Sequence, residues 1–166
     1  MKNKVEIIEA TSADFHAIAM IYNEFIALGT ATMDETLKTA DDIAGWCQKF
    51  HDREKLYVLK EEDTTIGWGI IKRYSDREGY RFACETAVYI TASQVGKGYG
   101  TMMKKHLIAS CKKLNYKHLI AKIFANNKGS IAYNLNLGYT IVGTQQQIGF
   151  KNDRWQDVVI MQYIID

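Results

Sequence analysis

The chain has 166 residues, of which 47% are hydrophobic and 24% are charged, and its formal net charge is +2. This size and balance are typical of a globular protein, so we expect residues 1–166 to form a single domain. The small net charge gives no reason to expect a nucleic acid or a membrane surface as a partner. The first residues lack an apolar signal segment and no run approaches 18 apolar residues, so we expect a cytoplasmic protein.

The first third of the chain predicts one strand and two helices. Residues 4–9 have the composition of a short strand. Thr11 and Asp14 resemble a capping box before a helix that should end near Gly29. Its apolar positions are Phe15, Ile18, Ala19, Tyr22, Phe25 and Ile26. A second helix should follow Thr39, with apolar residues at helical spacing at Ile43, Trp46, Cys47 and Phe50.

The middle of the chain predicts a three-stranded antiparallel meander. Residues 56–59, 65–72 and 81–90 are rich in strand-forming residues. Polar turn residues separate them near 61–63 and 76–79.

The last third alternates between helices and strands. We expect a helix at 101–115, a strand at 117–124, a helix at 128–137 and strands at 139–147 and 157–164. The full order is β-α-α-β-β-β-α-β-α-β-β. A strand, a crossover helix and another strand imply one parallel pair in an otherwise antiparallel sheet, which indicates the α/β (α+β) class.

A loop spaced by glycines joins the third meander strand to the next helix. Its glycines are Gly96, Gly98 and Gly100. Glycines let the backbone approach a phosphate and turn several N–H groups toward it, and a helix N-terminus favours negative charge. Lys97 adds a full positive charge. The spacing fits neither the P-loop nor the dinucleotide fingerprint. The loop therefore predicts a site for a pyrophosphate-bearing cofactor, and a tight turn without a ligand is the alternative.

The cysteines and histidines predict no metal site. Cys47, Cys84 and Cys111 lack the spacing of metal ligands. The histidines are scattered at His16, His51, His106 and His118. Cys84 is expected to be structural, because Glu85 next to it points to the other face of the strand and no spaced histidine and carboxylate could activate the thiol.

The element order and the glycine loop together resemble the GCN5-related N-acetyltransferases (GNAT). The loop pattern of that superfamily is Gln/Arg-x-x-Gly-x-Gly/Ala. Residues 95–100 match both of its glycines, with Val95 in the leading position and Gln94 one residue earlier. The resemblance implies a mixed, mostly antiparallel sheet of about seven strands, with helices on both faces and a splayed pair formed by the fourth and fifth strands.

Further segments resemble the phosphinothricin and methionine sulfoximine acetyltransferase branch. They are Cys84–Ile90, Leu137–Tyr139 and Gly149–Asp157, and Ile21–Asn23 also fits. The resemblance implies direct transfer of an acetyl group from acetyl-CoA, in a ternary complex, to the primary amine of an amino acid or analogue, by a homodimer. The alternatives are a polyamine, an aminoglycoside or a protein N-terminus as acceptor, or a non-catalytic acyl-CoA-binding module.

The resemblance also assigns the residues of the site. It implies that acetyl-CoA contacts Val88, Tyr89, Ile90, Val95, Gly96, Lys97, Gly98, Tyr99, Gly100, Thr101, Asn127 and Ser130. Glu85 matches the proposed base, and a salt-bridged strand carboxylate is its alternative role. Asn127 could instead serve as a helix N-cap. Asn134 stands where the family usually has a tyrosine; it cannot act as a general acid, so the acid is left open. The substrate-binding candidates are Phe25, Arg73, Arg77 and Tyr80, of which the arginines could bind a carboxylate.

Overall fold

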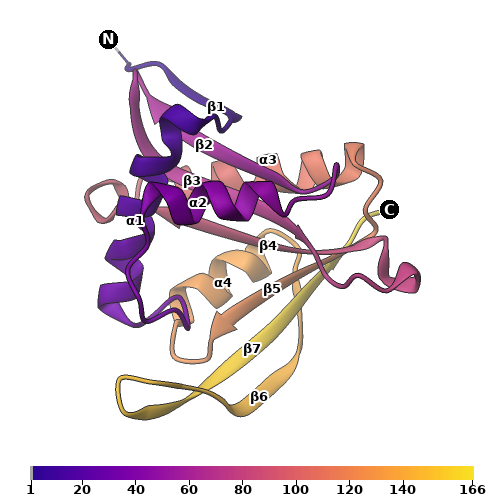
Figure 1. Ribbon diagram of the computed structural model, residues 1–166. Helices are drawn as coiled ribbons and strands as arrows, with labels where there is room; N and C mark the ends of the chain where they lie inside the picture. The colour runs from indigo at the N-terminus through magenta and orange to yellow at the C-terminus, as the bar shows by residue number, and fades with distance from the viewer. Residues whose placement is uncertain (1) are drawn as a thin grey trace.

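A computed structural model describes residues 2–166 as one seven-stranded sheet with helices on both of its faces (Figure 1). The strand order across the sheet is β1-β2-β3-β4-β5-β7-β6. The strands are β1 (Val5–Glu9), β2 (Lys55–Glu61), β3 (Thr64–Arg73), β4 (Ala83–Ile90), β5 (His118–Phe124), β6 (Thr140–Lys151) and β7 (Arg154–Ile164). The helices are α1 (Phe15–Leu28), α2 (Ala40–Gln48), α3 (Tyr99–Lys113) and α4 (Lys128–Asn136). Short 3-10 turns lie at Ser12–Asp14, Glu78–Tyr80 and Ala92–Gln94.

The predicted order of elements and the α/β class are confirmed. β4 and β5 form the predicted parallel pair, and every other pair in the sheet is antiparallel. Several boundaries differ from the prediction by one to four residues, and the differences in α3 and in the last two strands have a clear cause. α3 begins at Tyr99, two residues early, because Gly98 takes a left-handed conformation that starts the helix. The last two strands are longer than predicted and meet at the turn formed by Asn152 and Asp153, both of which have positive φ.

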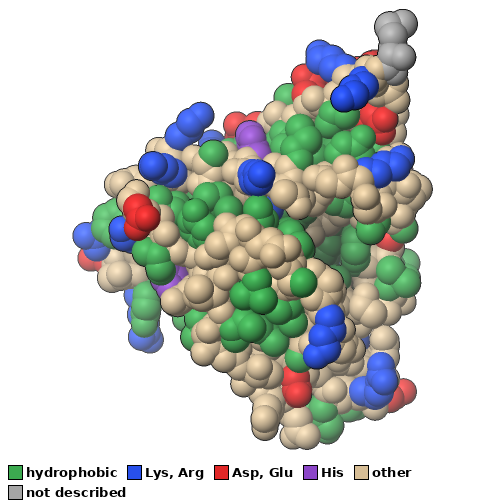
Figure 2. All heavy atoms as spheres, turned by 180° about the vertical axis from the view of Figure 1, so that it is seen from behind, with side chains coloured by type: hydrophobic (Ala, Val, Ile, Leu, Met, Phe, Trp, Pro, Cys, Tyr) green, Lys and Arg blue, Asp and Glu red, His purple; other side chains and the backbone are tan. Residues whose placement is uncertain are grey.

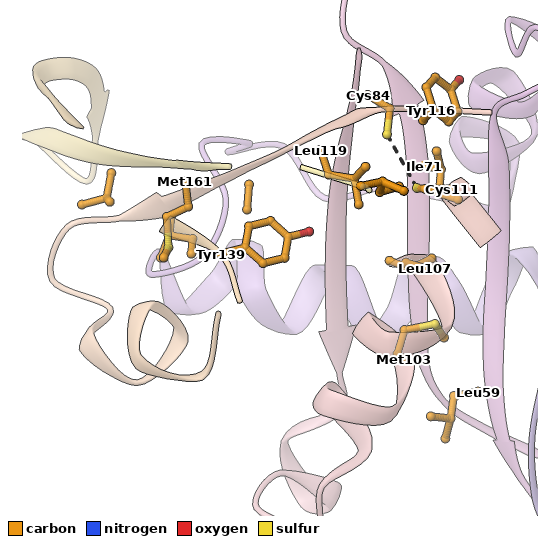
Figure 3. Close-up of a cluster of buried hydrophobic side chains, with 14 of the residues drawn as sticks. Leu59, Ile71, Cys84, Met103, Leu107, Cys111, Tyr116, Leu119, Tyr139 and Met161 are labelled. Carbon is orange, nitrogen blue, oxygen red and sulfur yellow. Dashed lines mark hydrogen bonds between the residues drawn. The ribbon is translucent and has the colours of Figure 1, made fainter. Parts of the chain in front are cut away.

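The alternation of side chains along the strands builds one core on each face of the sheet. On β3, Trp68 and Ile70 belong to the core under α1 and α2, whereas Ile71 belongs to the core under α3. Figure 3 shows the second core, in which Met103, Leu107 and Cys111 of α3 project toward the sheet residues. Each helix is thus held by its own buried stripe.

Gly69 brings α3 close to the middle of the sheet. A Cβ atom built on this residue would lie 2.8 Å from Sδ and 2.9 Å from Cγ of Met103, and 3.2 Å from Cδ1 of Leu107. Both side chains are fully buried, so they have little space in which to move aside. The absence of a side chain at position 69 therefore sets the distance between α3 and the sheet.

No helix in residues 2–166 combines the length and the apolar character that crossing a membrane requires.

Gly69→Ala should lower the free energy of unfolding by about 1–3 kcal/mol, because the added methyl group overpacks the contact with Met103. Urea denaturation followed by circular dichroism measures this change. Gly79→Ala is the matched control, because nothing lies within 4 Å of its Cβ position. Equal midpoints for both variants would contradict the packing described for Gly69.

Candidate active site

The parallel pair of strands opens into a wedge soon after it begins. β4 and β5 are paired only from Ala83 to Glu85, opposite His118–Ile120. From Thr86 to Ile90, β4 keeps its pairing with β3 but has no partner on β5. The backbone groups along that edge of β4 are therefore left for another molecule.

A cavity of about 560 Å³, which we call the wedge cavity, lies in this opening. Its walls come from β4, β5, the glycine loop and the first turns of α3 and α4. Eleven of the twelve residues predicted to contact the cofactor line it: Val88, Tyr89, Ile90, Val95, Gly96, Gly98, Tyr99, Gly100, Thr101, Asn127 and Ser130. Lys97 is the exception, because it does not line the cavity and its Nζ donates to Oε1 of Gln94 at 2.9 Å.

The glycine loop has the geometry of an anion site. Gly96 and Gly98 have φ values of +85° and +84°, and nothing lies within 4 Å of either Cβ position. Within residues 2–166, the amides of Gly96, Lys97 and Gly98 donate to no other backbone or side-chain group. These free N–H groups stand just before the N-terminus of α3, where the helix dipole favours negative charge.

Asn127 combines both roles considered for it from the sequence. Its Oδ1 accepts a hydrogen bond from the backbone N–H of Ser130 at 3.2 Å, which caps α4. The same two residues line the wedge cavity. The cap thus fixes the first turn of α4 at the wall of the wedge.

A second cavity of about 900 Å³, which we call the acceptor cavity, meets the wedge cavity across β4. The two cavities share six residues in their walls: Ala31, Thr86, Ala87, Tyr89, Lys122 and Phe124. Glu85 lines the acceptor cavity only, and its carboxylate lies 3.3 Å from Nζ of Lys122. A molecule in one cavity can therefore reach a molecule in the other beside Glu85.

The predicted substrate residues are not brought together. Phe25 lines the wedge cavity, where its ring packs 5.1 Å from that of Tyr89. Arg73 lines the acceptor cavity, but its guanidinium binds the carboxylates of Glu54 and Asp76. Arg77 and Tyr80 line neither cavity. Tyr80 instead packs against Tyr74, with 5.1 Å between ring centroids.

A buried lysine that the sequence did not single out ties together two segments that line the acceptor cavity. Lys151 of β6 is 1% exposed, and its Nζ donates to the backbone carbonyls of Thr32 at 2.7 Å and Asp34 at 2.6 Å. Burial lowers the pKa of Lys151. The sequence signal for Lys151 was its place in Gly149–Asp157, a segment that resembles the phosphinothricin and methionine sulfoximine acetyltransferase branch. The bonds hold the β6–β7 hairpin against the segment after α1, and both line the cavity.

Cys84 has the structural role expected for it. Its side chain is fully buried, and its Sγ lies 3.6 Å from that of Cys111 on α3. The hydrogen bond with Cys111, together with burial, raises the pKa of the Cys84 thiol. A protonated, inaccessible thiol is a poor nucleophile. Residues 2–166 hold no cluster of three or more His, Cys, Asp or Glu side chains suited to a metal ion.

Comparison with known proteins identifies the family to which this chain belongs. Residues 7–160 match the family model described as an acetyltransferase (GNAT) domain. The phosphinothricin N-acetyltransferase of Alcaligenes faecalis is 32% identical over 151 residues, which are 90% of this chain and 77% of that protein.

Two solved structures share the fold over nearly the whole chain. A GNAT superfamily phosphinothricin acetyltransferase from Sinorhizobium meliloti, in complex with AcCoA, has a TM-score of 0.91 and 29% identity over 97% of this chain and 88% of its own. A ribosomal-protein-alanine N-acetyltransferase from Brucella melitensis has a TM-score of 0.92 and 31% identity over 96% of this chain and 99% of its own.

Gly98→Ala should weaken the binding of CoA by about five- to thirtyfold, because a Cβ atom strains a left-handed backbone by about 1–2 kcal/mol. Isothermal titration calorimetry with CoA measures the affinity. Gly45→Ala is the control, because it adds a methyl group in α2 where nothing lies within 4 Å and where φ is ordinary. Equal affinities in the two variants would show that the loop conformation does not serve the ligand.

Proposed function

This chain belongs to the GNAT acetyltransferase family, and on that premise we propose that it acetylates the primary amine of a small molecule by direct transfer from acetyl-CoA in a ternary complex. The acceptor is an amino acid or an analogue of the phosphinothricin or methionine sulfoximine type. One observation carries the proposal: the wedge cavity and the acceptor cavity meet at shared wall residues, among them Thr86, Ala87 and Tyr89 of β4. A donor in one cavity and an amine in the other would therefore be in contact, which favours a single transfer step.

The wedge cavity suits acetyl-CoA along its whole length. The free amides of Gly96 and Gly98 and the N-terminus of α3 would receive the diphosphate. The unpaired edge of β4 would bond the amides of the pantetheine arm as an added strand does. Asn127 and Ser130 would contact the arm from the other wall. Bound there, the thioester supplies the activated acetyl group.

Glu85 is the proposed general base. An amine is largely protonated at neutral pH, so it must lose a proton before it can attack. Glu85 is the carboxylate of β4 at the wall of the acceptor cavity, next to the stretch that both cavities share. Its side chain is 33% exposed, so a proton taken from the amine can pass to water. Lys122, 3.3 Å away, would hold the carboxylate in place.

The charges around the acceptor cavity suit a zwitterionic amino acid. Both signs of charge line it: Asp34, Glu54, Asp76 and Glu85 against Lys38, Lys49, Lys72, Arg73 and Lys122. Arg73 is engaged by two carboxylates, whereas Lys72 makes no salt bridge within residues 2–166 and lies directly opposite Glu85 on the neighbouring strand. We therefore assign the carboxylate of the substrate to Lys72. Arg73 lines the cavity without binding that carboxylate.

A protein N-terminus is the second candidate acceptor. The structural likeness to a ribosomal-protein-alanine N-acetyltransferase, at 31% identity, favours it. The volume of about 900 Å³ leaves room for more than one residue. Alanine-terminated peptides therefore belong in the assay.

The exposed apolar residues of the last two strands support a homodimer. β6 is an edge strand, and it and β7 carry large exposed side chains: Ile141, Val142, Ile148, Phe150 and Trp155. Figure 2 shows hydrophobic patches on the lower half of the back of the molecule, the half that contains β6 and β7 in Figure 1. A second copy would cover this surface. We propose that residues 1–166 form one catalytic unit within a cytoplasmic homodimer.

Glu85→Gln should lower kcat for the amino-acid substrate by about 10²–10⁴-fold, because the amide cannot accept the proton of the amine. The affinity for acetyl-CoA should stay unchanged, because Glu85 does not line the wedge cavity. Release of the CoA thiol measures turnover with phosphinothricin, methionine sulfoximine, spermidine, an aminoglycoside and an alanine-terminated peptide.

Glu78→Gln is the matched control, because Glu78 lines neither cavity. Unchanged turnover of Glu85→Gln at saturating substrate would remove Glu85 from the mechanism. Turnover confined to the peptide would favour the second candidate, and binding of acetyl-CoA without turnover of any amine would indicate a binding module.

Light scattering in solution should give a mass of about twice 19.0 kDa for the wild-type protein. Trp155→Glu should return the mass to that of one chain, because Trp155 is 62% exposed on the proposed interface. Ile8→Glu serves as the control, with an exposed side chain on β1, the edge strand at the opposite end of the sheet from β6. A wild-type mass of one chain would exclude the dimer.

A further inference from the structure

A lysine is buried at the closed end of the wedge cavity. Lys104 of α3 is 2% exposed and lines the cavity. Its Nζ donates to Oγ1 of Thr86 at 2.9 Å and lies 4.7 Å from the centroid of the Tyr139 ring. Within residues 2–166 it makes no salt bridge. A buried ammonium without a carboxylate is costly, so its retention requires a reason.

The position of Lys104 follows from the opening of the sheet. Thr86 is the first residue of β4 beyond the last residue paired with β5. The ammonium that it holds therefore lies where the two strands separate. The glycine loop adjoins the other end of the unpaired stretch, after Ile90. A molecule that spans the wedge cavity with its diphosphate at the loop would bring its far end to Lys104.

A second buried polar atom of a residue that lines the wedge cavity has no partner in the described part of the chain. Asn134 of α4 is 2% exposed and lines the wedge cavity, and its buried Oδ1 makes no hydrogen bond. Its Nδ2 donates to the carbonyl of Ser130 at 2.8 Å, so the unused group of Asn134 is the acceptor Oδ1. Lys104 uses one of its three N–H donors on Thr86 and keeps the others. Two buried polar groups with unused capacity point to a polar atom of a ligand at this end.

The surroundings tune the ammonium for proton transfer. Burial lowers the pKa of Lys104 to about 8, while the buried thiols of Cys111 and Cys84 and the carboxylate of Glu85 oppose this shift. The tyrosine hydroxyls nearby stay neutral, since burial raises the pKa both of Tyr139, whose ring lies beside Nζ, and of Tyr133, which lines the same cavity. At pH 7 the group is mostly charged, yet it releases its proton close to physiological pH, which suits a general acid.

We propose that Lys104 is the general acid of the reaction. Its ammonium stabilises the thiolate that develops on CoA as the acetyl group leaves, and then protonates that thiolate. This inference rests on the proposed function. Glu85 first takes a proton from the ammonium group of the substrate and passes it to water. The nitrogen of the neutral amine then bonds to the acetyl carbon and gives a second proton to Glu85. The carbon–sulfur bond breaks with its electron pair on sulfur, and sulfur takes a proton from Nζ of Lys104. Glu85 then returns its proton to water and Lys104 recovers one from water, so atoms and charge balance.

The test compares Lys104→Met with Lys105→Met, which removes the neighbouring exposed lysine of the same helix. Lys104→Met should lower kcat by about 10²-fold or more, with a change in KM for acetyl-CoA of less than about threefold. The wild-type rate should fall as pH rises above about 8, because the acid is then deprotonated. This alkaline limb should be absent from the Lys104→Met profile and retained by Lys105→Met.

A second readout does not depend on turnover. The ultraviolet absorbance of the thiolate reports the thiol pKa of CoA bound to each protein. The wild-type protein and Lys105→Met should lower it by about one unit or more relative to CoA in water, and Lys104→Met should not. If Lys104→Met fails to fold, Lys104→Gln replaces it, because glutamine is polar and nearly as long but carries no charge. The thiol pKa of CoA bound to the wild-type protein can be measured without either variant.

Each outcome decides the proposal. Equal kcat, pH profiles and bound thiol pKa in wild type and Lys104→Met would overturn it. So would Tyr133→Phe losing activity while Lys104→Met keeps it, which would assign the acid to the half-buried tyrosine of α4. A wild-type protein that neither binds nor turns over acetyl-CoA would instead refute the proposed function.

Discussion

The separation of β4 from β5 after only three paired residues is the constraint on which the rest of the site depends. Had the strands stayed paired to Ile90, the backbone of β4 would be satisfied and the wedge cavity would be closed. Because they part at Glu85, β4 keeps one hydrogen-bonded edge on β3 and exposes the other. The same strand lies between the wedge cavity and the acceptor cavity. The two cavities meet where a residue of β4 lines both of them, as Ala87 does.

Packing on both faces of the sheet holds this opening in shape. The close contact at Gly69 sets the distance between α3 and the sheet, and the left-handed Gly98 starts the helix beside the free amides of the glycine loop. The helix also carries Lys104 to Thr86. On the other face, Lys151 ties the β6–β7 hairpin to the backbone of Thr32 and Asp34. The chemistry thus depends on elements that are far apart in the sequence.

The local patterns predicted what local forces decide. Helical stripes, caps and the glycine spacing predicted the element order and an anion site, because each depends on neighbours in the chain. The resemblance to the GNAT superfamily supplied the set of residues expected to contact the cofactor, of which eleven line the wedge cavity. The partners of a charged side chain could not be predicted in this way. Glu54, which engages Arg73, lies 19 residues earlier, and Lys104 is buried only because Thr86 and Tyr139 converge on it. The turn at Asn152 and Asp153 carried a local signal that the polar run before it obscured, so the last strands were predicted too short.

The central claim is that the open edge of β4 and the amides of the glycine loop hold acetyl-CoA. Hydrogen exchange of the backbone amides, measured with and without acetyl-CoA, tests it most directly. The account predicts that exchange slows within residues 86–101 and much less along β1 and β2, on the far side of the sheet. Binding of acetyl-CoA that leaves exchange in residues 86–101 unchanged, or slows it only elsewhere, would contradict the account.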